Sequence, residues 1–212
     1  MAKKIEKTNA ARLLDKAGIS YKLIPYEFDE NDLAAQHVAD SLGQDIARVF
    51  KTLVLHGDKT GHIVCVVPGN AEVDLKALAK ASGNKKVEMI AMKDLLSVTG
   101  YIRGGCSPVG MKKRFPTFFH STALSFETIY VSAGVRGLQL EIDPADLISF
   151  TGGSVADVAT ALWLILLIAG SSELSGRNTH DVAEYAVEIV DCGESAFLRY
   201  VGNRLFSLQN HG

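Results

Sequence analysis

Val49-Phe-Lys-Thr-Leu-Val-Leu55 is the segment that decides the fold. Branched, aromatic and aliphatic residues dominate it, and it contains no glycine or proline, so it predicts a β-strand. A polar turn, 56–61, follows, and then a second apolar run, Ile63-Val-Cys-Val-Val67. Two strand-forming runs joined by a short glycine-containing turn predict a β-hairpin.

Helices and strands are predicted on both sides of this hairpin. The predicted helices are 8–17, 31–42, 74–81 and one that begins at Asp143-Pro144, with a helical turn at 93–98. The predicted further strands are 19–26, 87–90, 117–119, 128–132 and 138–142. Gly18 and Gly43 are placed to end the first two helices, and Asn31 or Asp32 to begin the second. Several strands are joined by short turns, which favours an α+β fold with a mixed or antiparallel sheet and helices packed on it.

Composition and charge narrow the class of protein. Of the 212 residues, 47% are hydrophobic and 22% are charged, which is the balance of a soluble globular protein. The net charge of −2 excludes a general polyanion binder, so any nucleic-acid contact needs a local basic patch. Cys65, Cys106 and Cys192 lack the spacing of a metal or redox site, and so sparse a set fits the reducing cytoplasm. The charged N-terminus does not resemble a signal peptide.

The character of the chain changes near Val158. The apolar run 158–170 is too short to cross a bilayer core of about 30 Å as a helix, so it predicts a buried or interfacial helix. Residues 179–190 predict an amphipathic helix. These features divide the chain into a domain at 1–158 and a helical C-terminal extension at 159–212. The extension has no predicted role.

Lys51 is the first residue whose chemistry stands out. Side-chain alternation places it on the same strand face as Val49 and Leu53, and the opposite face is also largely apolar. A buried ammonium needs a carboxylate or an anionic ligand, because burying it alone is costly. The other interpretation is an edge-strand lysine that reaches water. The pattern alone leaves both open.

Three further segments carry candidate chemistry. The glycine-rich loop 100–110 allows close backbone approach to a carbonyl or phosphate oxygen, although the loop taken alone favours a long turn whose glycines serve backbone geometry only. Ser132 lies beside glycines but lacks the sequence of a nucleophile elbow, which favours a hydrogen-bonding role. The basic clusters Lys112-Lys-Arg114 and Lys85-Lys86 are either solvated surface or a patch that positions phosphates. The histidines form no ligand spacing, so no metal is expected.

Together these motifs resemble the YbaK/EbsC family. The segments that carry the resemblance include Ile19–Tyr26, Val49–Leu53, Thr99–Lys113, Phe126–Ser132 and Arg136–Leu138, and it extends from Thr8 to about Val158. The resemblance implies a free-standing relative of the editing domain of bacterial prolyl-tRNA synthetases. It also implies a partly closed sheet, and an aminoacyl-tRNA deacylase that removes a wrong amino acid, above all cysteine, from tRNA(Pro).

The resemblance assigns roles to individual residues. The family's essential lysine corresponds to Lys51, and the glycine that approaches the substrate corresponds to Gly104. The substrate-binding positions correspond to Tyr26, Tyr101, Gly105, Ser132 and Gln139. Gln139 stands where relatives often have aspartate, and Ala133 replaces a glycine, which leaves the preferred amino acid open.

The expected mechanism uses positioning and no cofactor. Lys51 would hold phosphate or ribose oxygens of the terminal nucleotide, while the N–H groups of Gly104 and Gly105 would face the ester carbonyl. The substrate's own thiol or a water would attack, and Cys106 would be structural. Lys112, Lys113 and Arg114 are the candidate tRNA contacts.

The expected partner is aminoacylated tRNA, with prolyl-tRNA synthetase as a further candidate and no role for DNA. A membrane-tethered regulator is a minor alternative that only the apolar run 161–169 favours. The alternative function is a non-catalytic module of the same fold that binds tRNA or a synthetase. Because every candidate site residue precedes Val158, the extension is expected to be dispensable for activity. The oligomeric state stays open.

Overall fold

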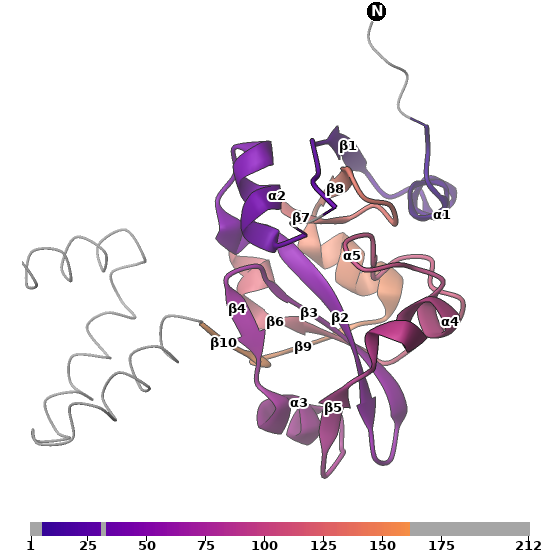
Figure 1. Cartoon of the computed structure of the whole chain (residues 1–212), viewed down its shortest axis with the longest axis vertical. Helices are drawn as coiled ribbons and strands as arrows, with labels where there is room; N and C mark the ends of the chain where they lie inside the picture. The colour runs from indigo at the N-terminus through magenta and orange to yellow at the C-terminus, as the bar shows by residue number, and fades with distance from the viewer. Residues whose placement is uncertain (1–5, 31–32, 162–212) are drawn as a thin grey trace, which may run out of the picture. The chain divides into compact units, whose positions relative to one another are not determined.

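Three β-sheets organise residues 6–30 and 33–161, the parts of the chain that this computed structural model describes (Figure 1). A three-stranded sheet has the order β1-β8-β7, a five-stranded sheet the order β5-β2-β3-β6-β9, and a two-stranded sheet pairs β10 with β4. The strands are β1 Tyr21–Pro25, β2 Phe50–Gly57, β3 Gly61–Pro68, β4 Ala71–Val73, β5 Val87–Met89, β6 Thr117–His120, β7 Ile129–Ser132, β8 Leu138–Ile142, β9 Ser154–Ala156 and β10 Ala159–Ala161.

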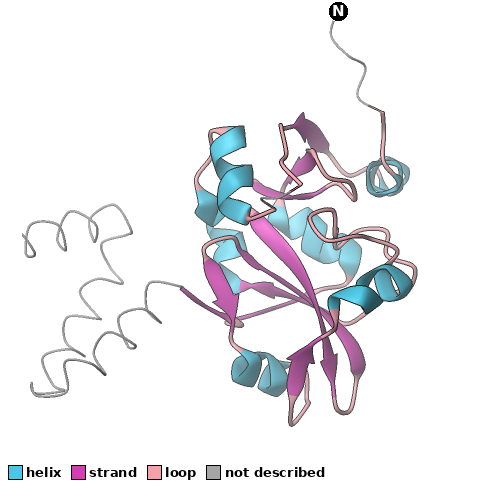
Figure 2. Cartoon of the chain, viewed as in Figure 1, coloured by secondary structure: helices cyan, strands magenta, loops and turns pink. Residues whose placement is uncertain are grey.

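Helices surround these sheets (Figure 2). They are α1 Asn9–Ala17, α2 Ala35–Leu42, α3 Leu75–Ala81, α4 Leu95–Thr99 and α5 Pro144–Thr151, with short 3-10 turns η1 Ile46–Arg48, η2 Met92–Asp94 and η3 Ser121–Ser125. Side-chain caps begin three of them, because Thr8, Asp74 and Asp143 each accept a backbone N–H of the first turn. In the described part of the chain, no helix is long and apolar enough to cross a membrane.

The predicted helix 31–42 is wrong at its start. Helix α2 begins only at Ala35, and Ala34 before it is extended, with φ −67° and ψ 147°. The proposed caps Asn31 and Asp32 lie outside the described residues. Leu33 instead lies against the glycine-rich loop, where its methyl groups come within 3.0–3.3 Å of a Cβ built on Gly104. Leu33 thus contacts the loop from outside the helix.

The central hairpin is confirmed, and the sheet around it is mixed. β2 and β3 pair antiparallel with Lys51 opposite Val67, and β5 pairs antiparallel with the far end of β2. β3–β6 and β6–β9 are parallel pairs. The mixed, largely antiparallel sheet that the sequence predicts is therefore present.

Three short strands, β4, β9 and β10, were not predicted. β10 corrects the prediction for the apolar run 158–170, because its first residues form a strand that pairs with β4 rather than a helix. The remainder of that run and the amphipathic helix at 179–190 lie outside the described residues. The domain boundary at Val158 stays a prediction, and β10 begins at the next residue.

The two larger sheets enclose one core. Phe50, Val64 and Phe119 from the five-stranded sheet pack with Val131 and Leu140 from the three-stranded sheet, and all are buried. The opposite face of the five-stranded sheet carries a second cluster that contains Leu55, Ile63 and Cys65 and packs against α3. Side-chain alternation sends neighbouring residues of β2 and β3 to these two different clusters, which explains why both faces are apolar.

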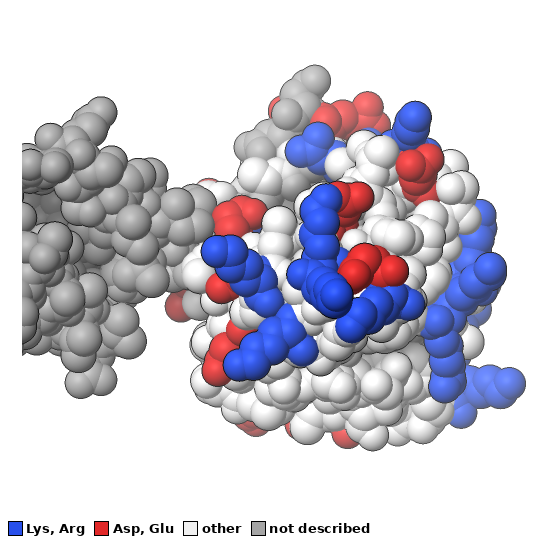
Figure 3. All heavy atoms as spheres, turned by 90° about the horizontal axis from the view of Figure 1, so that it is seen from below, with Lys and Arg blue, Asp and Glu red and all other residues white. Residues whose placement is uncertain are grey.

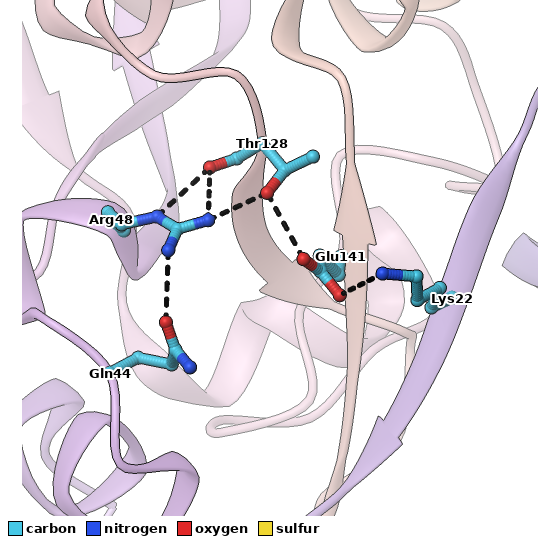
Figure 4. A network of polar contacts seen from close by, with 5 residues as sticks. All are labelled: Lys22, Gln44, Arg48, Thr128 and Glu141. Carbon is cyan, nitrogen blue, oxygen red and sulfur yellow. Dashed lines mark hydrogen bonds and ion pairs between the residues drawn. The ribbon is translucent and has the colours of Figure 1, made fainter.

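An isolated parallel bridge between Val49 and Tyr130 joins the two larger sheets. Arg48 holds this junction (Figure 4). Its guanidinium donates to the Thr128 carbonyl at 3.2–3.3 Å, to the Thr128 hydroxyl at 2.7 Å and to Gln44 at 3.0 Å. It also lies over the Tyr130 ring, 5.3 Å from the centroid. These contacts fix where β2 begins relative to β7, immediately before Lys51.

Candidate active site

Strand pairing brings three of the predicted site residues to one face. Val49 and Tyr130 are bridged, so the residues two positions further along each strand, Lys51 and Ser132, lie on the same side as that pair. Ser132 is directly opposite Gln139 in the β7–β8 ladder. Three strands from two sheets therefore carry a cation, a hydroxyl and an amide on a common face.

Lys51 is neither freely exposed nor buried alone. Its side chain is 25% exposed, and its Nζ lies 3.0 Å from Oε1 of Glu72 on β4. This ion pair resolves the two interpretations of the strand lysine, because the ammonium has a carboxylate partner and keeps partial access to solvent. An ammonium has three donors, so two remain for an anionic or carbonyl ligand.

Ser132 and Gln139 provide hydrogen-bonding groups with almost no solvent access. The Ser132 Oγ accepts the Gly134 N–H at 3.2 Å, which holds the turn that follows β7. Gln139 is 5% exposed, and its Oε1 has no hydrogen-bond partner among the residues described. An unsatisfied buried acceptor costs about 1–3 kcal/mol, so the position suits a donor brought by a ligand.

The glycine-rich loop lies against the turn between β7 and β8. Arg136 in that turn donates through Nε to the Arg103 carbonyl at 2.9 Å. Gly104 has φ +80°, a left-handed conformation that favours glycine. The Gly105 N–H already donates to the Ile102 carbonyl at 3.0 Å, whereas the Gly104 N–H has no acceptor within the described part of the chain. Of the two expected carbonyl donors, only Gly104 is available.

The two tyrosines have different surroundings. Tyr26 follows β1, and its N–H donates to the Gly137 carbonyl at 3.0 Å. Its ring packs with Val49 and Tyr130, on the face that carries Lys51. Tyr101 is buried, and its hydroxyl donates to the Val109 carbonyl at 2.6 Å. The Tyr101 hydroxyl thus closes the glycine-rich loop on itself and does not point to a free site.

Cys65 and Cys106 are both buried, and neither can supply a nucleophilic thiolate. Burial raises the pKa of each thiol to about 12, so both stay protonated near neutral pH. This agrees with the structural role predicted for Cys106. The described residues contain no group of three potential metal ligands. The described site residues offer the Lys51 ammonium and the Gly104 N–H as donors and Oε1 of Gln139 as an acceptor.

The predicted tRNA contacts are exposed, but one is already engaged. The Nζ of Lys112 donates to the carbonyls of Leu96 and Ser97 at 3.1 and 3.3 Å, which caps the end of α4. Lys113 and Arg114 are exposed. Figure 3 shows basic side chains on the lower face of the molecule, with acidic ones among them. No interaction connects Lys112, Lys113 or Arg114 to Lys51 in the described part of the chain.

Sequence reasoning missed Glu72 and Thr52. Glu72 lies on a three-residue strand that was not predicted. Nothing in the sequence pattern therefore indicated that its carboxylate pairs with Lys51. Thr52 was treated as an ordinary strand residue, yet its Oγ1 is buried and has no hydrogen-bond partner among the described residues. It lies beside Lys51 on the opposite strand face. A hydroxyl within an apolar strand is the signal that could have identified it.

Comparison with known proteins identifies relatives of this chain. The family model for the aminoacyl-tRNA editing domain matches residues 29–150. The "Putative Cys-tRNA(Pro)/Cys-tRNA(Cys) deacylase EbsC" of Enterococcus faecalis is 53% identical over 162 residues, which are 76% of this chain and 99% of that protein. A proline–tRNA ligase of Thermosipho melanesiensis is 31% identical over 81 residues, which are 38% of this chain and 14% of the ligase.

A solved structure supports the fold independently. The crystal structure of a "putative trans-editing enzyme for prolyl tRNA synthetase" has a TM-score of 0.63 at 23% identity and covers 72% of this chain and 98% of that one. Since the family model spans more than half of the sequence and one relative is more than half identical along nearly its whole length, this chain belongs to the aminoacyl-tRNA editing domain family.

Proposed function

We propose that this protein is a trans-editing aminoacyl-tRNA deacylase that releases cysteine from tRNA(Pro). The observation that carries the proposal is Lys51, a partly covered ammonium on the same face as Ser132 and Gln139. The substrate joins a polyanionic tRNA end to an ester and an α-ammonium group. A cation, an unpaired N–H and an unpaired buried acceptor complement these three parts.

Each group has a role in this proposal. The two free donors of Lys51 bind phosphate or ribose oxygens of the terminal nucleotide, and the Gly104 N–H faces the ester carbonyl, where negative charge develops. Oε1 of Gln139 accepts a hydrogen bond from the α-ammonium group of the amino acid. Tyr26 and Ser132 border the side chain. Tyr101 and Gly105 act indirectly, by keeping the glycine-rich loop in shape.

The attacking group is the substrate's own thiol or a water. With thiol attack, a carbon–sulfur bond forms, the ester C–O bond breaks, and the thiol proton passes to the departing ribose oxygen. The buried, protonated thiols of Cys65 and Cys106 support a route without a protein nucleophile. Alanyl-tRNA(Pro) separates the two routes, because it has no thiol and can be cleaved only by water.

The partners and compartment follow from the substrate. The similarity to a segment of a proline–tRNA ligase supports a link to the enzyme that charges tRNA(Pro), and the cytoplasm is where charging occurs. We expect the protein to act on tRNA after the synthetase releases it.

The test is deacylation of Cys-tRNA(Pro), Ala-tRNA(Pro) and a leucyl ester by purified protein. Lys51→Ala should lower the rate by about 10²–10³-fold while the fold persists. Lys86→Ala is the matched control, since Lys86 also pairs with a glutamate, at 2.7 Å, but lies away from the site on the β5 edge. Leucine adds bulk that the pocket should reject, at about 1–3 kcal/mol per methylene. Wild-type turnover by Lys51→Ala would disprove the site. Binding of tRNA without any deacylation would favour the non-catalytic alternative.

A further inference from the structure

We infer that Glu72 is a positioning residue for Lys51, and that strand β10, from the segment beyond Val158, fixes Glu72. The inference rests on the proposed role of Lys51. It adds a residue to the working unit and extends that unit past the boundary that the sequence suggests.

The first step is the ion pair. Glu72 Oε1 and Lys51 Nζ are 3.0 Å apart, with side chains 54% and 25% exposed. A lysine side chain has four rotatable bonds and would otherwise sample many rotamers around its strand. The carboxylate selects one of them, and it uses only one of the three ammonium donors. Glu72 therefore holds the Lys51 ammonium in one position and leaves two of its N–H donors for a ligand.

The second step is how the chain brings Glu72 to Lys51. After β3 ends at Pro68, the chain reverses at Gly69, whose N–H donates to the Val49 carbonyl at 2.7 Å. The turn is tight, because a Cβ built on Gly69 would lie 2.7 Å from Ala35 Cβ and 3.1 Å from the Val49 carbonyl oxygen. This bond joins the residue immediately before β2 to the turn two residues before β4, so it holds the two strands that carry Lys51 and Glu72 close together.

The third step is what holds β4. Its sheet partner in the described part of the chain is β10, with Thr160 directly opposite Glu72 (Figure 1). The Asp74 N–H extends the pairing by donating to the Val158 carbonyl at 2.9 Å. The Val158 N–H in turn donates to Nδ1 of His120 at 3.2 Å, which anchors the segment to β6. Without β10, the strand that carries Glu72 would lose this ladder.

These steps predict a specific kinetic signature. Loss of the carboxylate should release Lys51 and lower the rate of the chemical step by about three- to tenfold. It should not weaken tRNA binding, since removing a negative charge near the polyanion favours association. A residue that contacts tRNA directly would give the opposite pattern, with weaker binding.

The experiment uses the full chain and single-turnover deacylation of Cys-tRNA(Pro) with excess enzyme. This separates the maximal rate from the enzyme concentration that gives half of it. Glu72→Gln removes the charge, and Glu72→Asp restores a carboxylate on a shorter side chain and should recover part of the rate. Glu88→Gln is the matched control, because Glu88 forms an equivalent exposed pair with Lys86.

Two variants of β10 test the strand. Thr160→Pro removes a backbone N–H and disfavours pairing, whereas Thr160→Val keeps a β-branched residue in the strand. We expect Thr160→Pro to reproduce the rate loss of Glu72→Gln, and Thr160→Val to match the wild type. Circular dichroism verifies that each variant is folded.

The possible outcomes are distinct. The inference is supported if Glu72→Gln and Thr160→Pro lower the maximal rate while the enzyme concentration for half-saturation stays the same or falls. Glu88→Gln should leave both quantities unchanged. A wild-type maximal rate in Glu72→Gln overturns the inference. An unchanged maximal rate with a higher enzyme concentration for half-saturation overturns it as well. A normal rate in Thr160→Pro overturns the role of β10. If the wild-type protein itself shows no deacylation, the proposed function fails instead.

Discussion

Replacing Tyr101 with phenylalanine separates a structural role from a substrate-binding role. The Tyr101 hydroxyl donates to the Val109 carbonyl at 2.6 Å, and both residues are buried. Burial raises the pKa of Tyr101 to about 12, so the donor is present across the whole working pH range. Phenylalanine fills the same space and removes only this bond.

The expected cost is the cost of leaving the Val109 carbonyl without its donor. An unsatisfied buried acceptor costs about 1–3 kcal/mol in the free energy of unfolding. In a domain of this size, each kcal/mol lowers the Tm by roughly 2–4 °C. Because the hydroxyl faces the loop's own backbone, we expect the ratio of cysteinyl to alanyl ester cleavage to stay the same.

The assay combines urea unfolding with deacylation of the two esters. Tyr21→Phe is the control, because the Tyr21 hydroxyl lies 2.8 Å from the exposed carboxylate of Asp15 and 3.1 Å from the Ala11 carbonyl, at a partly exposed position where water can replace it. It should lose less stability than Tyr101→Phe. Unchanged stability with an altered ratio of the two ester rates would refute our reasoning and restore Tyr101 to the substrate pocket.

Two further predictions concern stability. Gly69→Ala should lower the free energy of unfolding by about 1–3 kcal/mol, because the new Cβ would lie 2.7 Å from Ala35 Cβ. Denaturant unfolding measures this change, and a midpoint equal to that of the wild type would contradict the tight turn. Burial lowers the pKa of the His120 imidazole below its ordinary value. As the pH falls, the unfolded chain therefore takes up a proton before the folded one, and stability decreases. Comparing unfolding of the wild type and His120→Gln from about pH 7 to 5 tests this, since the variant should show the weaker pH dependence, and equal slopes would argue against it.

The central hairpin and the capped helices were predictable because their causes are local. Alternation within 49–55 and the turn after it are enough to define β2 and β3, and Asp143-Pro144 marks the first turn of α5. The strands β4, β9 and β10 were not predictable in this way. Each has three residues, too few to show a period of two, and each exists because a distant strand offers it a ladder.

The candidate site shows the same division. Lys51 stood out because a charge within an apolar strand needs an explanation, Ser132 because it lies beside glycines, and Gln139 entered through the family resemblance. Their common face depends on the Val49–Tyr130 bridge, which joins residues far apart in the sequence. The Gly105 N–H and the Tyr101 hydroxyl both donate to carbonyls of the glycine-rich loop. These bonds depend on the conformation of that loop, which hydrophobic periodicity does not predict.

The late position of β9 and β10 has a consequence for synthesis of the protein. The β2–β3 hairpin pairs neighbouring residues and can form as soon as it leaves the ribosome, whereas β6–β9 and β4–β10 join segments made at very different times. Lys51 is therefore translated early, but its carboxylate partner gains a fixed position only after residues 159–161 emerge. The order of chain growth delays assembly of the site until the domain around it is nearly complete.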